Sequence, residues 1–314
     1  MDLKEIESQI EQLREQLASL DENDVKMQKL RENLAHAIDE MKRDVYQELD
    51  AYDKVYLARH ALRPNTKFYI KHLFDDFLAC HGDRLYGDDA AIIGGIAMLG
   101  DTPVTVIGHV KGSTTEENIK ANFGMPHPEG YRKAMRLALQ AEKFNRPIIT
   151  FIDTPGAYPG VGAEERGQSE AIARCLMTFM GLKVPVIAVV IGEGGSGGAL
   201  AISGGNHLIM LEHSVYSVLS PEGFASILYK DASRAKEVAS IMKLTADDLL
   251  NFGVIDQIIK EPLGGAHEHP EAIIPELKKI LSFKLAEFAT LNASEISEHR
   301  YQKFQKIGSL SPCE

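Results

Sequence analysis

The feature that most constrains the fold of this chain is an apolar segment that runs directly into a glycine-rich turn. Residues 184–191 read Val-Pro-Val-Ile-Ala-Val-Val-Ile, and Gly-Glu-Gly-Gly-Ser-Gly-Gly follows at once. The apolar segment is too short to cross a bilayer, and its β-branched residues are typical of a buried strand. We therefore expect a strand that ends at the glycines and a helix that begins there.

The same pattern recurs along the chain. Short segments rich in Val and Ile and bounded by Gly or Pro predict strands, and helical patterns lie between them. The alternation indicates an α/β fold with largely buried strands, and its loose repeat suggests a coiled, superhelical arrangement. Strands are expected at 90–99, 103–108, 147–152, 185–191, 207–211 and 215–219, and helices at 129–143 and 163–177.

Both ends of the chain are expected to be helical. Leucines and isoleucines spaced by three and four form one stripe before Asp21–Asp24 and a second stripe after it, which predicts a helical hairpin. The hairpin either docks a partner subunit or simply packs on itself. We divide the chain into a hairpin (1–53) and an α/β domain (54–314) whose C-terminal helices begin near residue 262.

Composition narrows the functional classes. The 314 residues carry a net charge of -11, and an acidic surface of this kind disfavours nucleic acid as a partner. Cys80, Cys175 and Cys313 are too far apart for a zinc site, and they are expected to be reduced thiols. The N-terminus does not resemble a signal peptide. We therefore expect a cytoplasmic protein without a membrane segment.

The glycine-rich turn predicts a site for an oxygen that becomes anionic. Glycines allow backbone N–H groups to approach a ligand, and the first N–H groups of a helix lack intrahelical acceptors. With the helix dipole, these donors suit an oxyanion. We favour Gly194 and Gly195 as the donors. The alternative is a turn that serves only tight packing of strand against helix.

The same turn also matches G-x-S-x-G through Gly194, Ser196 and Gly198. This match raises the alternative that the protein is a serine hydrolase with Ser196 as its nucleophile. Such an enzyme needs a base held in position, and His207 and His213 lie in or beside an expected strand. Composition explains the match equally well, because glycines surround the serine.

A second strand-to-helix turn, Phe151–Gly160, is expected to line the same pocket. Its Asp-Thr-Pro-Gly would fit a GTPase only beside a P-loop, which the sequence lacks. Lys111, Arg132 and Lys133 are candidates for an anion contact, although the last two fit a solvated helix face equally well. His267-Glu-His269 is expected to be a solvated loop, since no third metal ligand is suitably spaced.

These segments, in this order, resemble the α subunits of the carboxyltransferase of bacterial acetyl-CoA carboxylases. The resemblance covers nearly the whole chain. It rests on Asn122–Pro126, Pro128–Lys133, Phe151–Gly160, Ala163–Glu170, Gly192–Gly198, Ser220–Gly223 and Glu261–His267. The family is more basic after its Gly-His-x-Lys-Gly stretch than this chain is at Ser113–Glu117.

The resemblance implies a crotonase-like (ClpP/crotonase) fold, a spiral of ββα units with an N-terminal helical hairpin and C-terminal helices. It also implies an α2β2 assembly in which the β subunit holds acetyl-CoA and carries zinc, while this chain binds no metal. The biotin carboxyl carrier protein would deliver carboxybiotin, and a biotin carboxylase would use ATP to charge it. The product would be malonyl-CoA for fatty acid synthesis.

The resemblance places the oxyanion hole for carboxybiotin at Gly194 and Gly195. Negative charge left on the ureido oxygen would be stabilised by their N–H groups, without a side-chain nucleophile. Residues expected to line the carboxybiotin and CoA pocket are Gly156, Ala157, Tyr158, Pro159, Gly160, Gly197, Gly198 and Lys111.

Overall fold

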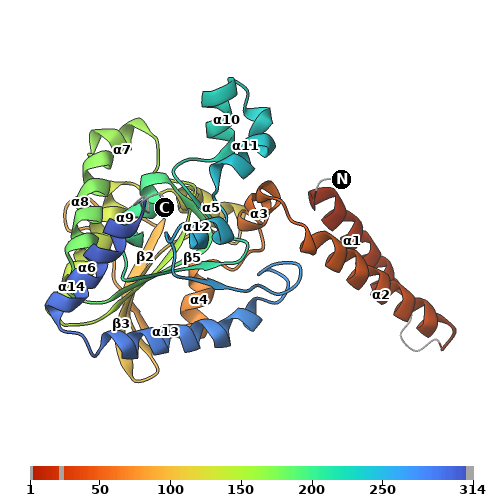
Figure 1. Cartoon of the computed structure of the whole chain (residues 1–314), viewed down its shortest axis with the longest axis horizontal. Helices are drawn as coiled ribbons and strands as arrows, with labels where there is room; N and C mark the ends of the chain where they lie inside the picture. The colour runs from red at the N-terminus through yellow and green to blue at the C-terminus, as the bar shows by residue number, and fades with distance from the viewer. Residues whose placement is uncertain (1–2, 21–24, 309–314) are drawn as a thin grey trace, which may run out of the picture.

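A mixed β-sheet runs through the molecule and carries helices on both faces (Figure 1). The computed structural model describes residues 3–20 and 25–308. Within them the sheet has the order β1-β2-β3-β4-β5-β6-β8, and β7 pairs with β5 beside that path. The strands are β1 (Asp75–Ala79), β2 (Ile92–Leu99), β3 (Thr102–His109), β4 (Ile148–Thr154), β5 (Val186–Gly195), β6 (His207–Leu211), β7 (Val215–Ser217) and β8 (Gln257–Ile259).

The sheet changes from antiparallel to parallel at β3. β1, β2 and β3 pair antiparallel, whereas β3 through β6 and β8 pair parallel, as β7 does with β5. Parallel neighbours need crossover connections. These contain α5 (Thr115–Lys120), η1 (Asn122–Gly124), α6 (Pro128–Lys143), α7 (Val161–Glu165), α8 (Gln168–Gly181) and α9 (Ser196–Ser203).

Apolar side chains pack on both faces of the sheet. Leu137 of α6 and Phe179 of α8 belong to the core on one face. On the other face, Leu73 of α4 (Thr66–Leu73) packs with Leu281 of α13 (Ile274–Phe288). The last helix of the described residues is α14 (Ala293–Lys306). Strands β4 and β5 are buried along their whole length, as expected of central parallel strands.

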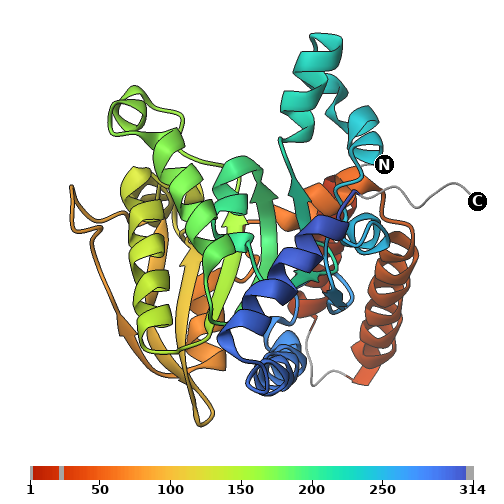
Figure 2. The same ribbon diagram turned by 60° about the vertical axis from the view of Figure 1, so that its left-hand side comes forward.

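Two helical segments stand out from the same side of the sheet. Figure 2 shows α7 on one side and α10 (Pro221–Tyr229) with α11 (Ala235–Met242) on the other. The remaining short elements are η2 (Ala232–Arg234), α12 (Ala246–Asn251) and η3 (Pro270–Ile273). The glycine-rich turn lies in the part of the sheet between these two projections.

The first two helices form an arm. α1 (Leu3–Ser19) and α2 (Val25–Gln47) pack on each other and project from the body, and α3 (Ala51–Ala58) connects them to it (Figure 1). Ile10 and Ile38 are buried, whereas Leu30 is 50% exposed. The expected hairpin is thus present, while its expected turn, Asp21–Asp24, lies outside the described residues. No helix in the described residues has the length and apolar character to span a membrane.

Several expectations from the sequence need correction. The single helix expected at 163–177 is divided at Gly167, whose φ of 81° ends α7 and begins α8. Strand β1 was not expected, because its exposed Asp75–Ala79 lacks an apolar pattern. The loop at His267–His269 is not simply solvated. The His267 ring stacks on His60, and Glu268 accepts hydrogen bonds from Arg14 and Lys42 of the arm.

Candidate functional site

Strand β5 runs into helix α9 without an intervening loop. The strand ends at Gly195, which is the N-cap residue of α9 and provides no side chain to cap it. Four glycines within five positions allow this close passage, because a Cβ on Gly195 would stand 2.2 Å from the Pro155 carbonyl oxygen. The predicted strand-to-helix turn is therefore present, with the helix beginning at Ser196.

Gly194 and Gly195 belong to the sheet itself. Gly194 is in register with Tyr216 of β7 on one side and with Thr154 of β4 on the other, and Gly195 is in register with Ser217. Residues that are paired within a sheet use their backbone groups in its ladder. Gly194 and Gly195 thus form the end of the strand, directly before the first turn of α9.

The first turn of α9 supplies the nearest unpaired donors. The initial N–H groups of a helix have no intrahelical acceptor and carry the positive end of the dipole. In α9 these positions are Ser196, Gly197 and Gly198. A Cβ on Gly197 would meet only the Ile172 side chain, at 3.4 Å, so this glycine is open to a ligand. The helix start thus fits a developing anion.

The second predicted turn contacts the first through backbone atoms. A Cβ on Gly198 would stand 2.7 Å from the carbonyl carbon of Gly156 and 2.8 Å from the nitrogen of Ala157. Gly156 has a φ of 146°, which suits glycine alone. The structure therefore brings Gly156 and Ala157 together with Gly195 and Gly198, as the sequence predicted.

Buried polar side chains fix the second turn. The Gly156 amide donates to Thr154 Oγ1 at 3.0 Å, and that hydroxyl donates to the Gly156 carbonyl at 2.8 Å. Gln168 Nε2 donates to the carbonyl oxygens of Pro126 and Tyr158. The Tyr158 ring stacks on His127 at 4.2 Å between centroids. Beyond it, the exposed Pro159 and the half-buried Gly160 lead into α7.

Lys111 lies in a different hollow from the glycine-rich turn. Its Nζ donates to Asp153 Oδ1 at 2.7 Å, and the Glu193 amide donates to the same oxygen at 3.1 Å. The hollow has a volume of about 630 Å³ and also includes Arg59 and Asn65. Lys111 therefore helps to hold the ends of β4 and β5 in place, through its ion pair with Asp153. The Asp153 side chain is buried, with 5% of its surface exposed.

An apolar pocket opens at the start of α9. It has a volume of about 410 Å³. Ser196 and Gly197 contribute its polar backbone, and the rest of its lining comes from Leu200, Tyr216, Ser217, Val218, Phe224, Met242, Lys243, Leu249 and Val254. A mostly apolar pocket with a few convergent donors is the usual form of a small-molecule site. Of the predicted residues, only Gly197 lines it directly, together with Ser196.

Ser196 has an unusual backbone for a residue with a side chain. Its φ of 56° lies in the left-handed region, which costs roughly 1 kcal/mol for an L-residue. The residue is exposed, and no histidine in the described part of the chain hydrogen bonds to its hydroxyl. The strained turn is typical of a nucleophile elbow, but the base that such an elbow needs is missing.

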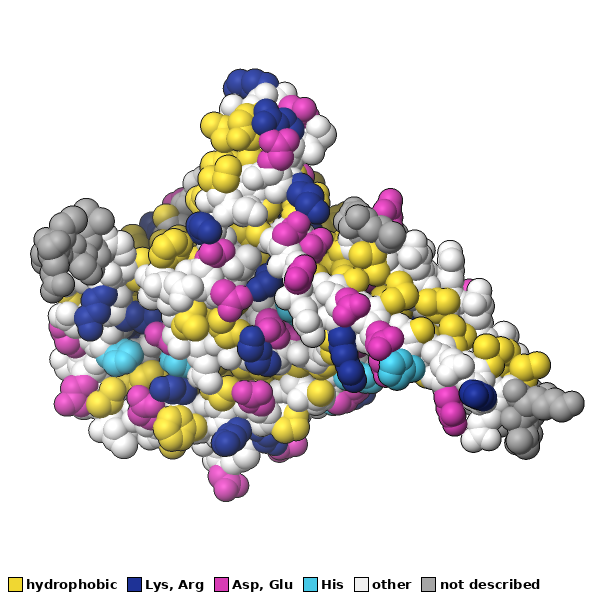
Figure 3. Space-filling view, turned by 45° about the vertical axis from the view of Figure 1, so that its right-hand side comes forward, with side chains coloured by type: hydrophobic (Ala, Val, Ile, Leu, Met, Phe, Trp, Pro, Cys, Tyr) yellow, Lys and Arg dark blue, Asp and Glu magenta, His cyan; other side chains and the backbone are white. Residues whose placement is uncertain are grey.

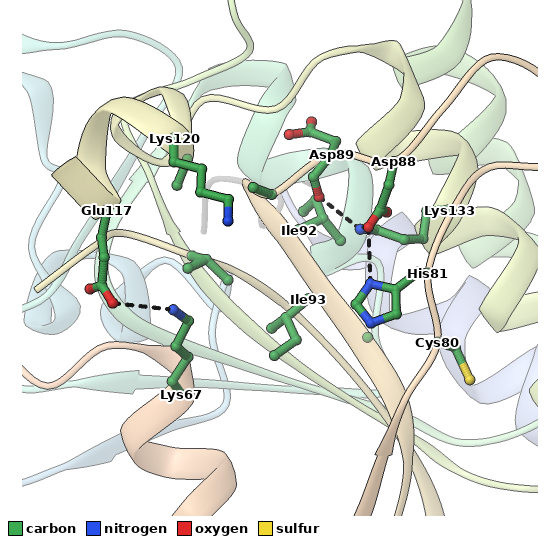
Figure 4. Close-up of a pocket in the computed structure, with 14 residues that line it drawn as sticks. Lys67, Cys80, His81, Asp88, Asp89, Ile92, Ile93, Glu117, Lys120 and Lys133 are labelled. Carbon is green, nitrogen blue, oxygen red and sulfur yellow. Dashed lines mark hydrogen bonds and ion pairs between the residues drawn. The ribbon is translucent and has the colours of Figure 1, made fainter.

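A further pocket, of about 310 Å³, lies beside β2 and α5 (Figure 4). Its charges are largely paired within the protein. Lys133 Nζ donates to Asp88 at 2.5 Å, His81 also contacts Asp88, and Lys67 lies 3.9 Å from Glu117. Lys133 is only 2% exposed, so its expected place on a solvated helix face is wrong. We assign no chemistry to this pocket.

Sequence reasoning missed the walls of the apolar pocket. Tyr216 is held by a hydrogen bond between its hydroxyl and Ser203, and β7 places it beside Gly194. Strand β7 was expected, but its pairing with β5 is a long-range contact that a local pattern does not reveal. Among the described residues, no cluster of His, Cys, Asp and Glu could hold a metal ion.

Comparisons with known proteins agree on one family. Residues 1–308 match the family model for "acetyl co-enzyme A carboxylase carboxyltransferase-like" proteins. The acetyl-coenzyme A carboxylase carboxyl transferase subunit alpha of Clostridium perfringens (strain ATCC 13124) is 59% identical over 267 residues, which are 85% of this chain and 98% of that protein.

Two solved structures show the same fold. A chain of a Pseudomonas malonate decarboxylase hetero-tetramer in complex with coenzyme A matches with a TM-score of 0.60 and 17% identity. The match covers 77% of this chain and 92% of that one. Transcarboxylase 12S matches with a TM-score of 0.57 and 19% identity, over 71% of this chain and 41% of its own. The fold is therefore the crotonase-like fold expected from the sequence.

Proposed function

This chain belongs to the family of acetyl-coenzyme A carboxylase carboxyltransferase α subunits, and we propose that the first turn of α9 is its oxyanion site. The family assignment makes it part of a biotin-dependent enzyme that transfers a carboxyl group to acetyl-CoA and produces malonyl-CoA. It does not support the alternative of a serine hydrolase. The open question is which atoms of this chain serve the reaction.

The observation that carries the proposal is the open start of α9. Gly197 lines the apolar pocket, and Gly198 lies against the Gly156–Ala157 peptide. Gly194 and Gly195, favoured from the sequence, are in register with neighbouring strands and do not line this pocket. We therefore assign the donors to Gly197 and Gly198, with Gly194 and Gly195 as the strand end that holds the helix start in place.

The pocket fits the ring system of biotin in size and chemistry. Leu200, Val218 and Phe224 offer apolar walls for its hydrocarbon part, while the backbone of Gly197 offers a donor for its polar edge. Carboxybiotin, when bound, supplies the carboxyl group and leaves negative charge on its ureido oxygen. Preorganised amides at that oxygen contribute roughly 3 kcal/mol each to transition-state stabilisation.

The subunit is proposed to act only with a partner. Hydrophobic side chains are exposed around the pocket on α9 through α12, among them Val218 (76%), Ile227 (66%) and Ile241 (60%). Figure 3 shows hydrophobic side chains on the projection formed by α10 and α11. Such surfaces mark protein contacts. We propose that a β subunit with zinc covers this surface in an α2β2 assembly and holds acetyl-CoA. Biotin carboxyl carrier protein would enter between the subunits.

Reconstitution tests this proposal. The chain is combined with a carboxyltransferase β subunit, and malonyl-CoA decarboxylation is measured in the presence of free biotin. We expect turnover by the combination and none by either chain alone. Turnover of malonyl-CoA by this chain alone would contradict the proposed division of the site.

A further inference from the structure

Two fully buried side chains pack against the first turn of α9 from the interior of the protein. Tyr131, on α6, and His109, at the end of β3, are both 0% exposed. The Tyr131 hydroxyl has no hydrogen-bond partner in the protein. Neither ring nitrogen of His109 has a partner at good hydrogen-bond geometry, although the backbone of Gly198 and that of Phe151 lie near the ring. Leaving a buried polar group unpaired costs about 1–3 kcal/mol, so two of them at one place call for an explanation.

Both side chains converge on Gly198. The Tyr131 hydroxyl lies 2.9 Å from the position that a Cβ on Gly198 would occupy, so it packs directly under this glycine. The same position is 2.7 Å from the Gly156 carbonyl carbon, which places the hydroxyl beside the contact of the two turns. The backbone of Gly198 also lies close to the His109 ring.

The His109 ring is neutral at ordinary pH. Burial lowers its pKa to about 4, although the Asp153 carboxylate nearby favours the charged form. A neutral ring and a hydroxyl can fill the space behind a helix start without adding a second positive charge to the dipole. The pair therefore suits a rigid support better than a role in proton transfer.

An unpaired tyrosine hydroxyl does not by itself indicate function in this chain. Tyr69 also has a fully buried hydroxyl without a partner, but it packs with Phe151 in the core on the other face of the sheet. What distinguishes Tyr131 is its contact with the proposed oxyanion turn. Tyr69 thus provides a matched control.

We propose that Tyr131 and His109 are positioning residues for carboxyl transfer. They pack beneath the first turn of α9 and fix its position, and we call this pair of side chains the backstop. Tyr131 packs beside the Gly156–Ala157 peptide, on the same side of Gly198. The two side chains thereby set how closely Gly198 approaches that peptide, and so fix the direction of the Gly197 amide. The inference rests on the proposed function, because it assumes that this amide serves the reaction. Neither side chain touches the substrate.

The test compares Tyr131→Phe with Tyr69→Phe in the complex with the β subunit. Each variant loses only one buried hydroxyl oxygen. For Tyr131→Phe we expect kcat to fall about tenfold or more, because small misplacements of a catalytic group are costly. KM for acetyl-CoA should stay within about twofold, since uniform binding is unchanged. Tyr69→Phe should leave both constants unchanged, and His109→Asn should repeat the loss in kcat.

A second measurement separates this proposal from the proposed function. Amide hydrogen exchange of the segment 193–200 in the isolated chain should accelerate in Tyr131→Phe and remain unchanged in Tyr69→Phe. If the wild-type complex transfers no carboxyl group, the proposed function fails, and the exchange result still decides the backstop. Unchanged exchange together with unchanged kcat in Tyr131→Phe would overturn the proposal. Equal losses in both variants would also overturn it.

Discussion

Gly198 and Gly156 come from different strand-to-helix turns and touch through their backbones. A Cβ on Gly198 would stand 2.7 Å from the Gly156 carbonyl carbon, closer than any side chain tolerates. Close contact requires a glycine at position 198, and the φ of 146° requires a glycine at position 156. This contact places the start of α9 beside the Gly156–Ala157 peptide.

Gly198→Ala should disable the subunit. The added methyl group forces the two turns apart, and overpacking of this kind costs about 1–3 kcal/mol of stability. The amides then lose their alignment, so kcat should fall about a hundredfold or more. Steady-state carboxyl transfer by the reconstituted complex measures the effect. Gly181→Ala is the control, because a Cβ there meets nothing within 4 Å. Full activity in Gly198→Ala would show that the contact is unimportant.

Ser196→Ala should retain carboxyl transfer, because the hydroxyl has no assigned base. Ser196→Gly should raise stability by roughly 1 kcal/mol, since its φ of 56° suits glycine. Thermal unfolding and the transfer assay check the two effects. A serine-directed covalent probe should leave the protein unlabelled. Labelling of Ser196, with loss of activity in the alanine variant, would instead favour a serine nucleophile.

Much of this site was visible in the sequence, and the rest depended on distant contacts. The strand, the glycines and the second turn are local patterns, and they predicted that the two strand-to-helix turns would line one pocket. Gly194 and Tyr216 are 22 residues apart in the chain, and a local pattern does not reveal that they pair in the sheet. The sequence also did not single out Tyr131, because an apolar position on an amphipathic helix looks the same whether it packs in the core or beneath a site.

Glu261→Gln should destabilise the chain strongly. Arg63 and Glu261 form an ion pair with side chains that are 3% and 0% exposed, and Arg63 Nε also donates to the Ile191 carbonyl of β5. Removing one charge leaves the other buried and unpaired, which costs about 3–5 kcal/mol. Urea denaturation measures the loss. Glu237→Gln, in the solvent-exposed pair with Arg234, should leave stability nearly unchanged, because water screens this pair. Equal effects would contradict this explanation.

Acid should loosen the arm through Glu268. Burial alone would raise the pKa of this carboxyl, but hydrogen bonds from Arg14 and Lys42 outweigh it and lower the pKa to about 2. A lowered pKa means that the stabilisation is complete above the ordinary value of 4.5 and is lost as the pH falls toward 2. The rate of limited proteolysis within the arm, measured between pH 6 and about pH 3, should rise as the pH falls. Glu268→Gln should be cleaved faster at pH 6, and identical cleavage of variant and wild type would contradict the prediction.

The most direct test of the oxyanion site is a crystal structure of the α and β chains with biotin bound. The ureido oxygen should lie about 2.7–3.2 Å from the amide nitrogens of Gly197 and Gly198, with its ring in the apolar pocket beside Leu200. A ureido oxygen that contacts the Ser196 hydroxyl instead, or one bound away from the start of α9, would contradict the assignment.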